Sequence, residues 1–350
     1  MPNMVRVKIL GGGRQVGKNA ILISDAHCNI LLDYGVDIGG EEPEFPLHVR
    51  PRDLDLIAVT HAHLDHSGAL PLLYVSASPK LVSTRTTLML SELLINDFLK
   101  LSKYYAPYES RDVQSMKEHF IEMRINQEAV FGKDAIIRFH EAGHIPGSVM
   151  IDLEISGTKI LYTGDFNTMS TCLLKGATTV PFKEADIVIM EATYAEFNHP
   201  PREKVEEALV EDIVEVLDSG GTVLIPSFAV GRSQEVMCLL AKYDLGYPIF
   251  IDGMARKVID ILNSNTDSLA NPRLFKKACS MVRRVKNWRD RREALRRPSI
   301  IIAPAAMLKG GASVFYMKKL LDDPKNAVFF VSYLIPDTPA RGLLLSLIHI

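Results

Sequence analysis

The sequence has few cysteines, no long apolar run and no excess of charge of either sign. Its four cysteines are scattered and include no CxxC pair, so we interpret them as reduced thiols rather than as a disulfide framework. No apolar run is long enough to span a bilayer, and the N-terminal segment MPNMVRVKIL predicts a strand rather than the apolar core of a signal peptide. These absences predict a cytoplasmic protein with no membrane partner.

The charge balance excludes a large uniform electrostatic field. Lysine and arginine together number 40 and aspartate and glutamate 42, which gives a formal net charge of -2. Any site for a polyanion therefore has to be local. The 350 residues, of which 47% are hydrophobic, are ample for buried cores and favour two domains over one.

Hydrophobic patterns divide the chain near residue 195. In the first part, short apolar runs alternate with turns and predict strands, whereas residues 80–130 predict helices. From about residue 200, helical patterns alternate with buried apolar runs such as TVLIPSF, SIIIAPA and AVFFVSY. This alternation indicates a parallel sheet covered by helices on both faces. We expect an α/β protein with domains at 1–195 and 196–350.

A glycine-rich segment near the start resembles a phosphate-binding loop. Residues 12–19 read GGRQVGKN and fit GxxxxGK, but Asn19 stands where a hydroxyl residue would bind magnesium, and a strand pattern rather than a helix follows. We therefore favour a glycine-rich turn between two strands.

The strongest chemical signal is THAHLDH, residues 60–66, directly after the strand pattern LDLIAVT. Neutral imidazole and carboxylate are the ligands that zinc prefers. In an extended chain His61 and His63 point the same way, and the following turn can present Asp65 and His66 to a second ion. The alternative, a solvated histidine-rich loop, is disfavoured by the clustered spacing.

Three further segments supply what this cluster lacks. His144 lies in EAGHIPGS, where glycines permit a tight backbone, and Asp165 lies in ILYTGDFN at the end of a buried strand pattern. Each alone would be an ordinary turn residue, but a two-metal site needs a bridging carboxylate. Asp33, in NILLDYG, could orient a ligating imidazole or the metal-bound water.

The order of these motifs resembles that of a known superfamily. The first four motifs of the metallo-β-lactamase superfamily resemble the segments LDYG, HAHLDH, HIPGS and TGD of this sequence. Motifs of its β-CASP RNA nuclease group are similar to IVIMEATYAE, PSFAVGRSQE, PIFIDGMA and IIAPAAMLKGG. The resemblance covers residues 5–344 and is closest to archaeal relatives of the cleavage-and-polyadenylation specificity factor nuclease. It implies a metallo-β-lactamase αββα sandwich, incomplete at the C-terminus, followed by a β-CASP α/β domain with a mainly parallel sheet.

The resemblance also implies two Zn²⁺ ions as cofactors. One ion would be held by three histidines and the other by Asp65 and His66, with Asp165 bridging both. The ligands it implies are His61, His63, Asp65, His66, His144 and Asp165.

Two further acidic residues match catalytic positions of the family. Asp33 matches the aspartate beside the metal-bound water. Glu191 matches the acidic residue that orients a later histidine proposed as general acid, although a strand-end carboxylate in solvent is its alternative interpretation. With Asp65 and Asp165, these residues are the predicted catalytic group.

The implied function is zinc-dependent hydrolysis of RNA phosphodiester bonds, in RNA 3′-end processing or decay. The expected partner is single-stranded RNA, and the protein is expected to form a homodimer or to join an RNA-processing complex. Endonuclease and 5′-to-3′ exonuclease both stay open. The alternatives are a non-catalytic scaffold subunit, for which degraded metal motifs would be expected, and a β-CASP DNA nuclease.

The family pattern is not continued after about Leu344. Relatives carry later histidine motifs there, whereas this sequence ends in LLLSLIHI, in which His349 lacks a neighbouring aspartate. We expect a C-terminally truncated chain that is not fully active and can be inactive.

Substrate contacts have two candidate sources. Arg232 follows Gly231 at a predicted strand-to-helix junction, which suits a phosphate contact. The segment MVRRVKNWRDRREALRRPS, residues 281–299, carries eight cations, including Arg289, around the single tryptophan of the chain, a composition that can hold a nucleic-acid backbone and stack a base. For this segment we favour the other interpretation, an amphipathic surface helix with Val285, Trp288 and Leu295 turned inward.

Overall fold

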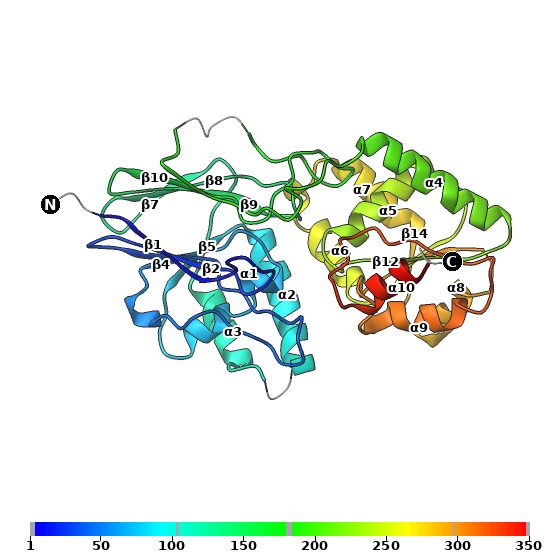
Figure 1. Cartoon of the computed structure of the whole chain (residues 1–350), viewed down its shortest axis with the longest axis horizontal. Helices are drawn as coiled ribbons and strands as arrows, with labels where there is room; N and C mark the ends of the chain where they lie inside the picture. Colours follow the sequence, from blue (N-terminus) through cyan, green and yellow to red (C-terminus); the bar gives the residue numbers. More distant parts are fainter. Residues whose placement is uncertain (1–3, 103–104, 180–183, 297, 348–350) are drawn as a thin grey trace. The chain divides into compact units, whose positions relative to one another are not determined.

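The computed structural model describes residues 4–102, 105–179, 184–296 and 298–347 (Figure 1). The chain folds into two compact units. The first comprises Met1–Ser170 and Lys175–Ala192, and the second comprises Thr171–Leu174 and Thr193–Ile350. Arg297, one of the eight cations of residues 281–299, and His349 lie outside the described residues.

The first unit begins with a six-stranded sheet in the order β1-β2-β3-β4-β5-β6. β1, β2 and β3 pair antiparallel, and β3 to β6 pair in parallel. The turn between β1 and β2 contains GGRQVGKN, so the predicted glycine-rich turn between two strands is confirmed. The strands are β1 (Arg6–Gly11), β2 (Ala20–Ser24), β3 (Asn29–Leu32), β4 (Leu56–Ala58), β5 (Lys80–Ser83) and β6 (Phe120–Glu122).

Alternate residues of this sheet face two different cores, as the two-residue period of a strand requires. Leu31 and Ile57 pack with the helices, whereas their neighbours Ile30 and Leu56 pack against a second sheet. Figure 1 shows the helices of this unit on one side of the two stacked sheets. These helices are α1 (Leu64–Ser67), α2 (Arg85–Ser102) and α3 (Ser110–Glu118).

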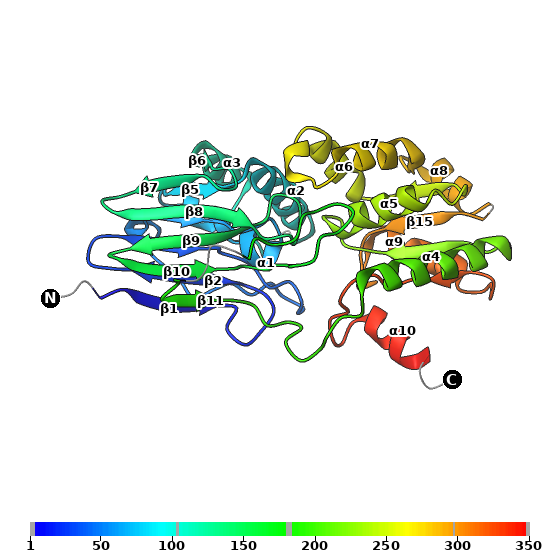
Figure 2. The ribbon, with the colours of Figure 1, turned by 90° about the horizontal axis from the view of Figure 1, so that it is seen from above.

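The second sheet has five strands in the order β11-β10-β9-β8-β7. In Figure 2 no helix of the first unit covers its outer face in the part of the chain that is described, and part of that face packs against the loop residues Phe166, Ala177 and Ala185. The layers are therefore helix, sheet and sheet. The strands are β7 (Glu128–Phe131), β8 (Ala135–Glu141), β9 (Val149–Ile155), β10 (Thr158–Tyr162) and β11 (Ile187–Ile189).

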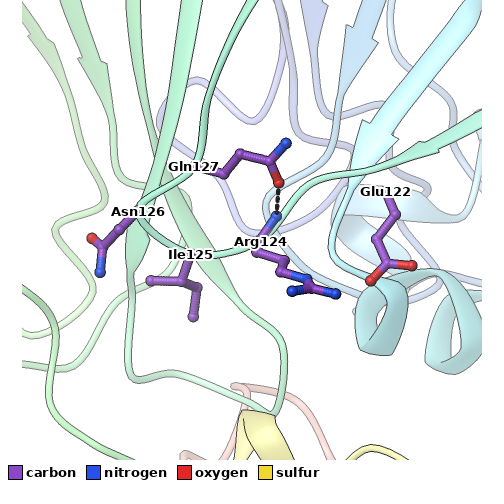
Figure 3. Close-up of a pocket in the computed structure, with 5 residues that line it drawn as sticks. All are labelled: Glu122, Arg124, Ile125, Asn126 and Gln127. Carbon is purple, nitrogen blue, oxygen red and sulfur yellow. Dashed lines mark hydrogen bonds between the residues drawn. The ribbon is translucent and has the colours of Figure 1, made fainter.

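The prediction that residues 80–130 are helical is wrong at both ends. Residues 80–83 form β5, and 120–122 form β6, with Leu81 opposite Phe120 in a parallel pair. Short apolar runs suit either a helix or a buried strand when periodicity is the only guide, and here sheet pairing decides. The turn from β6 to β7 surrounds a surface hollow lined by Glu122, Arg124, Ile125, Asn126 and Gln127 (Figure 3). None of the predicted site residues lines it.

The second unit contains a five-stranded sheet in the order β14-β13-β15-β12-β16, and every pair in it is parallel. The predicted parallel sheet is confirmed. Of the predicted strand AVFFVSY, Ala327 and Val328 form β16, and the N–H of Phe329 donates to the carbonyl of Leu224 at 2.9 Å. The strands are β12 (Val223–Pro226), β13 (Ile249–Ile251), β14 (Val282–Arg284), β15 (Ile300–Ala303) and β16 (Ala327–Val328).

Helices lie on both faces of this parallel sheet (Figures 1 and 2). On one face, α8 and α9 contribute Ala294 and Tyr316 to a core with Phe250 and Ile301. No helix in the described part of the chain is long and apolar enough to cross a membrane. The helices are α4 (Arg202–Asp218), α5 (Arg232–Tyr243), α6 (Ala255–Asn263), α7 (Pro272–Met281), α8 (Trp288–Ala294), α9 (Gly311–Leu320) and α10 (Pro339–Leu347).

Candidate metal centre

The histidine-rich segment lies at the C-terminal end of the buried strand β4. His61 and His63 follow that strand, and the short helix α1 carries Asp65 and His66. The neighbouring strand β3 ends beside it, because the backbone N–H of Tyr34 donates to the carbonyl of His66 at 2.8 Å. A Cβ on Gly35 would lie 1.7 Å from the Asp65 carbonyl oxygen, so this close approach of two chain segments requires glycine.

Two loops of the second sheet bring His144 and Asp165 to the same place. The loop with His144 is attached to the histidine segment by a hydrogen bond from the Val149 N–H to the Thr60 carbonyl, at 2.9 Å. Asp165 follows Gly164, whose φ is +52° and whose Cβ would lie 2.7 Å from the Thr60 hydroxyl oxygen. The structure thus places all the predicted ligands at one end of the two stacked sheets.

The ligand atoms form two groups that share Asp165. In the first group, the donor atoms of His61, His63, His144 and Asp165 lie within 4.8 Å of one another; in the second, those of Asp65, His66 and Asp165 do so. Asp165 Oδ2 is 3.5 Å from His144 Nε2, and Asp165 Oδ1 is 3.3 Å from His66 Nε2. Each oxygen of one carboxylate therefore faces a different group, as a bridging ligand requires.

The environment of His61 fits a metal ligand. Its Nε2 is buried without a hydrogen-bond partner and lies 3.8 Å from Asp165 Oδ2, while its Nδ1 lies 3.0 Å from the Thr60 hydroxyl. Burial lowers the pKa of His61 well below its ordinary value, and the neighbouring His66 lowers it further, against Asp165. The ring is therefore neutral at physiological pH. Neutral imidazole is the form that coordinates a divalent ion, and Nε2 is the atom that is available for it.

His66 is oriented by a buried carboxylate. The N–H at its Nδ1 donates to Asp33 Oδ2 at 2.7 Å, which leaves Nε2 as the atom that faces Asp165. Burial lowers the pKa of His66, but Asp165, Asp65 and Asp33 raise it by more, so that the pKa lies well above the ordinary value. The same carboxylate field that favours an imidazolium also favours a bound cation.

The pKa of Asp165 is shifted in the opposite direction. Burial raises this pKa, but the charge and hydrogen bond of His66 lower it by more, and His61 and His144 lower it further, so that the pKa lies well below its ordinary value. Asp165 is therefore an ionised carboxylate among four imidazoles, which suits a bridge between two cations.

The chain matches the models of two known families. Residues 13–210 match the metallo-beta-lactamase superfamily, and residues 233–343 match the Beta-Casp domain. The chain belongs to the metallo-β-lactamase superfamily. The family and fold class predicted from the sequence are confirmed, and the second unit carries the β-CASP domain.

Several similar proteins are archaeal. The chain is 42% identical to RNase aCSPSF2 of Saccharolobus solfataricus, over 97% of this chain and 69% of that protein. It is 36% identical to Probable RNase MJ4 of Methanocaldococcus jannaschii, over 95% and 80% of the two chains. It is 34% identical to Transcription termination factor FttA of Pyrococcus abyssi, over 96% of this chain and 57% of that protein.

Similarity to a solved structure concerns the fold alone. A protein of unknown function from Enterococcus faecalis V583 superimposes with a TM-score of 0.59 over 99% of this chain and 85% of that chain, at 12% identity. The superfamily implies a divalent metal, and among the described residues of this unit the His/Asp groups given above could hold it.

Two residues of the site were not predicted from the sequence. Asn19, the last residue of the segment that resembles a phosphate-binding loop, lies with its side-chain Nδ2 3.0 Å from His66 Nε2. The Tyr162 hydroxyl donates to Asp33 Oδ2 at 2.8 Å. Nothing in the spacing signals either contact, because Asn19 reaches the site through the β1–β2 turn and Tyr162 through the second sheet.

The remaining predicted site residues do not belong to the two donor groups. Glu191 follows β11 and is half-buried; its Oε1 accepts a long hydrogen bond of 3.5 Å from the N–H of Phe166, the residue after Asp165. Arg232 is the first residue of α5 and Arg289 is an exposed residue of α8, both in the β-CASP unit.

A third group of donor atoms, in Cys172, Glu206 and Glu235, is already neutralised by cations. Glu206 accepts from Arg202 Nε at 2.7 Å and from Lys242 Nζ at 2.9 Å. Glu235 pairs with the same Arg202 and accepts from the N–H of Leu173 at 2.8 Å. The ion pairs join α4 to α5, and the N–H groups of Cys172 and Leu173 attach residues 171–174 to Glu235. We therefore assign no metal to this group.

Proposed function

We propose that this protein is a zinc-dependent ribonuclease that hydrolyses RNA phosphodiester bonds at the Asp165 site. The observation that carries the proposal is the pair of donor groups that share Asp165, one facing each oxygen of its carboxylate. Similarity to archaeal proteins named as RNases supports RNA as the substrate. Single-stranded RNA is the expected partner and the cytoplasm the expected location, and we also propose a homodimer or an RNA-processing complex.

The donor set favours two zinc ions. His61, His63 and His144 would hold one ion, Asp65 and His66 the other, and Asp165 both, because neutral imidazole and carboxylate are the common zinc ligands in hydrolases. When bound, zinc supplies Lewis acidity and makes hydroxide available near neutral pH.

The other residues of the site orient these ligands. Asp33 holds His66 through its Nδ1, and the Thr60 hydroxyl contacts both Asp33 and His61. We propose that Asp33 acts by fixing the His66 tautomer. Glu191 accepts a hydrogen bond from the N–H of the residue after Asp165. We propose that Glu191 holds a group that protonates the leaving oxygen.

The direct test measures metal content and RNA cleavage together. Purified protein should contain about two zinc ions per chain and should cleave single-stranded RNA labelled at either end. EDTA should abolish cleavage, and added zinc should restore it. The pattern of labelled products separates endonuclease from 5′-to-3′ exonuclease. A metal-loaded protein that leaves RNA intact but cuts DNA of the same sequence would contradict the proposal.

Arg232 is proposed to bind an RNA phosphate. Among the described residues no carboxylate pairs with its guanidinium, since the neighbouring Glu235 is paired with Arg202. Burial lowers the pKa of Arg232, an effect that Glu235 opposes and Arg202 reinforces, yet a guanidinium stays charged at neutral pH. A half-buried unpaired cation is costly, and a phosphate would neutralise it. The N–H groups of Arg232 and Ser233 donate to backbone carbonyls, so the contact rests on the guanidinium.

Substitution of Arg232 should weaken RNA binding without weakening the fold. We expect Arg232→Ala to raise the Kd for single-stranded RNA by about tenfold, as the loss of one charge-assisted hydrogen bond predicts, and Arg232→Lys to recover part of the affinity. Fluorescence anisotropy in EDTA measures binding without cleavage. Arg273→Ala, which removes an exposed cation of α7, is the matched control. Equal affinities for the Arg232→Ala and Arg273→Ala variants would exclude this contact.

A further inference from the structure

The only tryptophan of the chain is exposed on the β-CASP unit. Trp288 begins α8 and keeps 63% of its surface in solvent. The predicted inward orientation of Trp288 is therefore wrong, although Val285 is buried as predicted. Ala294 of α8 and Tyr316 of α9 occupy the core below α8 instead.

This exposed indole is held in place by stacked side chains. The guanidinium of Arg291 lies 5.0 Å from the Trp288 ring centroid and 5.2 Å from that of Phe315, and the two rings pack edge to face at 5.1 Å. Cation–π and aromatic pairs of this geometry are attractive. The indole is thus restrained by contacts with Arg291 and Phe315, while 63% of its surface remains in solvent.

The stack is anchored to the parallel sheet. Arg291 Nε donates to Asp252 Oδ2 at 2.7 Å, and the Tyr316 hydroxyl donates to the same oxygen at 3.0 Å. Asp252 directly follows β13 and is only 2% exposed. A buried carboxylate therefore fixes Arg291, and Arg291 in turn fixes the indole.

The cations of this segment divide into paired and unpaired residues. Arg283, Arg284 and Arg291 are paired with acidic side chains. No acidic partner in the described part of the chain pairs with the exposed side chains of Lys286, Arg289, Arg292 and Arg296.

Helical spacing places further positive charge beside the aromatic pair. Arg292 is four residues after Trp288 in α8, and Lys318 and Lys319 are three and four residues after Phe315 in α9. Residues at this spacing lie on the same side of a helix. The exposed lysines of α9 therefore extend the positive surface of α8 around the aromatic pair.

We propose that Trp288 is a stacking site for a base of single-stranded RNA, with Lys286, Arg289 and Arg292 binding the adjacent phosphates. A restrained, exposed aromatic ring next to unpaired cations is the combination that binds single strands without sequence preference. An apolar protein surface would have to desolvate these cations, whereas a polyanion releases counterions when it binds them. The proposal rests on the proposed ribonuclease function only in naming RNA, rather than another single-stranded nucleic acid, as the ligand.

The single tryptophan makes the proposal directly measurable. A saturating RNA oligonucleotide, added to the full chain in EDTA, should quench the intrinsic tryptophan fluorescence, because all of that emission comes from Trp288. Heparin, a polyanion without bases, should bind to the cations but leave the emission largely unchanged. Double-stranded RNA, whose bases are already stacked, should quench much less.

Substitutions separate stacking from charge. Trp288→Ala should raise the Kd for single-stranded RNA about tenfold, and Trp288→Phe should retain most of the affinity. The salt dependence of RNA binding should fall in a triple variant that combines Lys286→Ala, Arg289→Ala and Arg292→Ala. It should not change in Lys204→Ala, which removes an exposed cation of α4. Thermal unfolding of each variant checks that the fold is intact.

The outcomes distinguish this proposal from the proposed activity. RNA cleavage without quenching, and with equal affinity of the Trp288→Ala variant, overturns the stacking site alone. Quenching without cleavage supports the stacking site while contradicting the ribonuclease function. Equal quenching by heparin and RNA would also overturn the proposal, because it would report charge rather than stacking.

Discussion

Simultaneous replacement of Asp65 and His66 by alanine should reduce RNA cleavage at least about a thousandfold. These two residues are the members of the second donor group that do not belong to the first, so their loss leaves Asp165 alone to hold the second ion. The zinc content should fall from about two ions to about one per chain. Metal analysis and single-turnover cleavage of labelled RNA measure both effects.

The double variant should stay folded. His66 is one of several donors to Asp33, which still accepts hydrogen bonds from the Thr60 N–H, the Thr60 hydroxyl and the Tyr162 hydroxyl. A matched control is His48→Ala with Asp53→Ala, which removes an exposed histidine and an exposed aspartate from the same unit. The ligand assignment would be refuted if the Asp65 and His66 double variant bound two ions or cleaved RNA at the rate of the control.

Replacement of Asp33 by alanine should have the largest effect on stability. Asp33 is fully buried and accepts from the Thr60 N–H, the Thr60 hydroxyl, the Tyr162 hydroxyl and His66 Nδ1, all at 2.7–2.8 Å. Removal of the carboxylate leaves these donors buried without their acceptor, which costs about 3–5 kcal/mol. Calorimetry should show the Tm of the first unit lowered by roughly 10 °C.

Asp33→Asn separates this structural role from the role in metal binding. The amide has nearly the same shape and keeps one acceptor oxygen, so most of the stability should remain. Its NH₂ group, when turned toward His66, favours the tautomer that carries its proton on Nε2, the nitrogen that faces Asp165. We therefore expect a stable variant with one bound zinc and little activity. Normal binding of two ions by this variant would show that Asp33 does not fix the tautomer.

The convergence of several predicted site residues could be expected, because they follow recognisable elements. His61 and His63 follow a buried strand pattern, and Asp165 and Asp33 end two others. The C-terminal ends of neighbouring strands meet at one edge of a sheet, so their side chains are expected to converge. His144 was harder to predict, since a lone histidine between glycines is common in turns; its significance depends on the other ligands.

Short apolar runs show where sequence reasoning failed. Residues 80–83 and 120–122 were predicted as helical, yet they pair with each other in the first sheet. Periodicity over three or four residues does not distinguish a buried strand from a helix. The pairing partner decides, and residues 80 and 120 are about forty positions apart in the chain.

The sequence by itself determined the superfamily, the alternation of helices and parallel strands in the second unit, and the kinds of donor available to a metal ion. These are properties of local order, namely which residue types follow which periodic pattern. The tertiary structure alone decided that Asn19 contacts His66, that Tyr162 contacts Asp33 and that Trp288 is turned to solvent. Such contacts depend on how distant segments fill space and where hydrogen-bond partners remain available, and no local pattern records either.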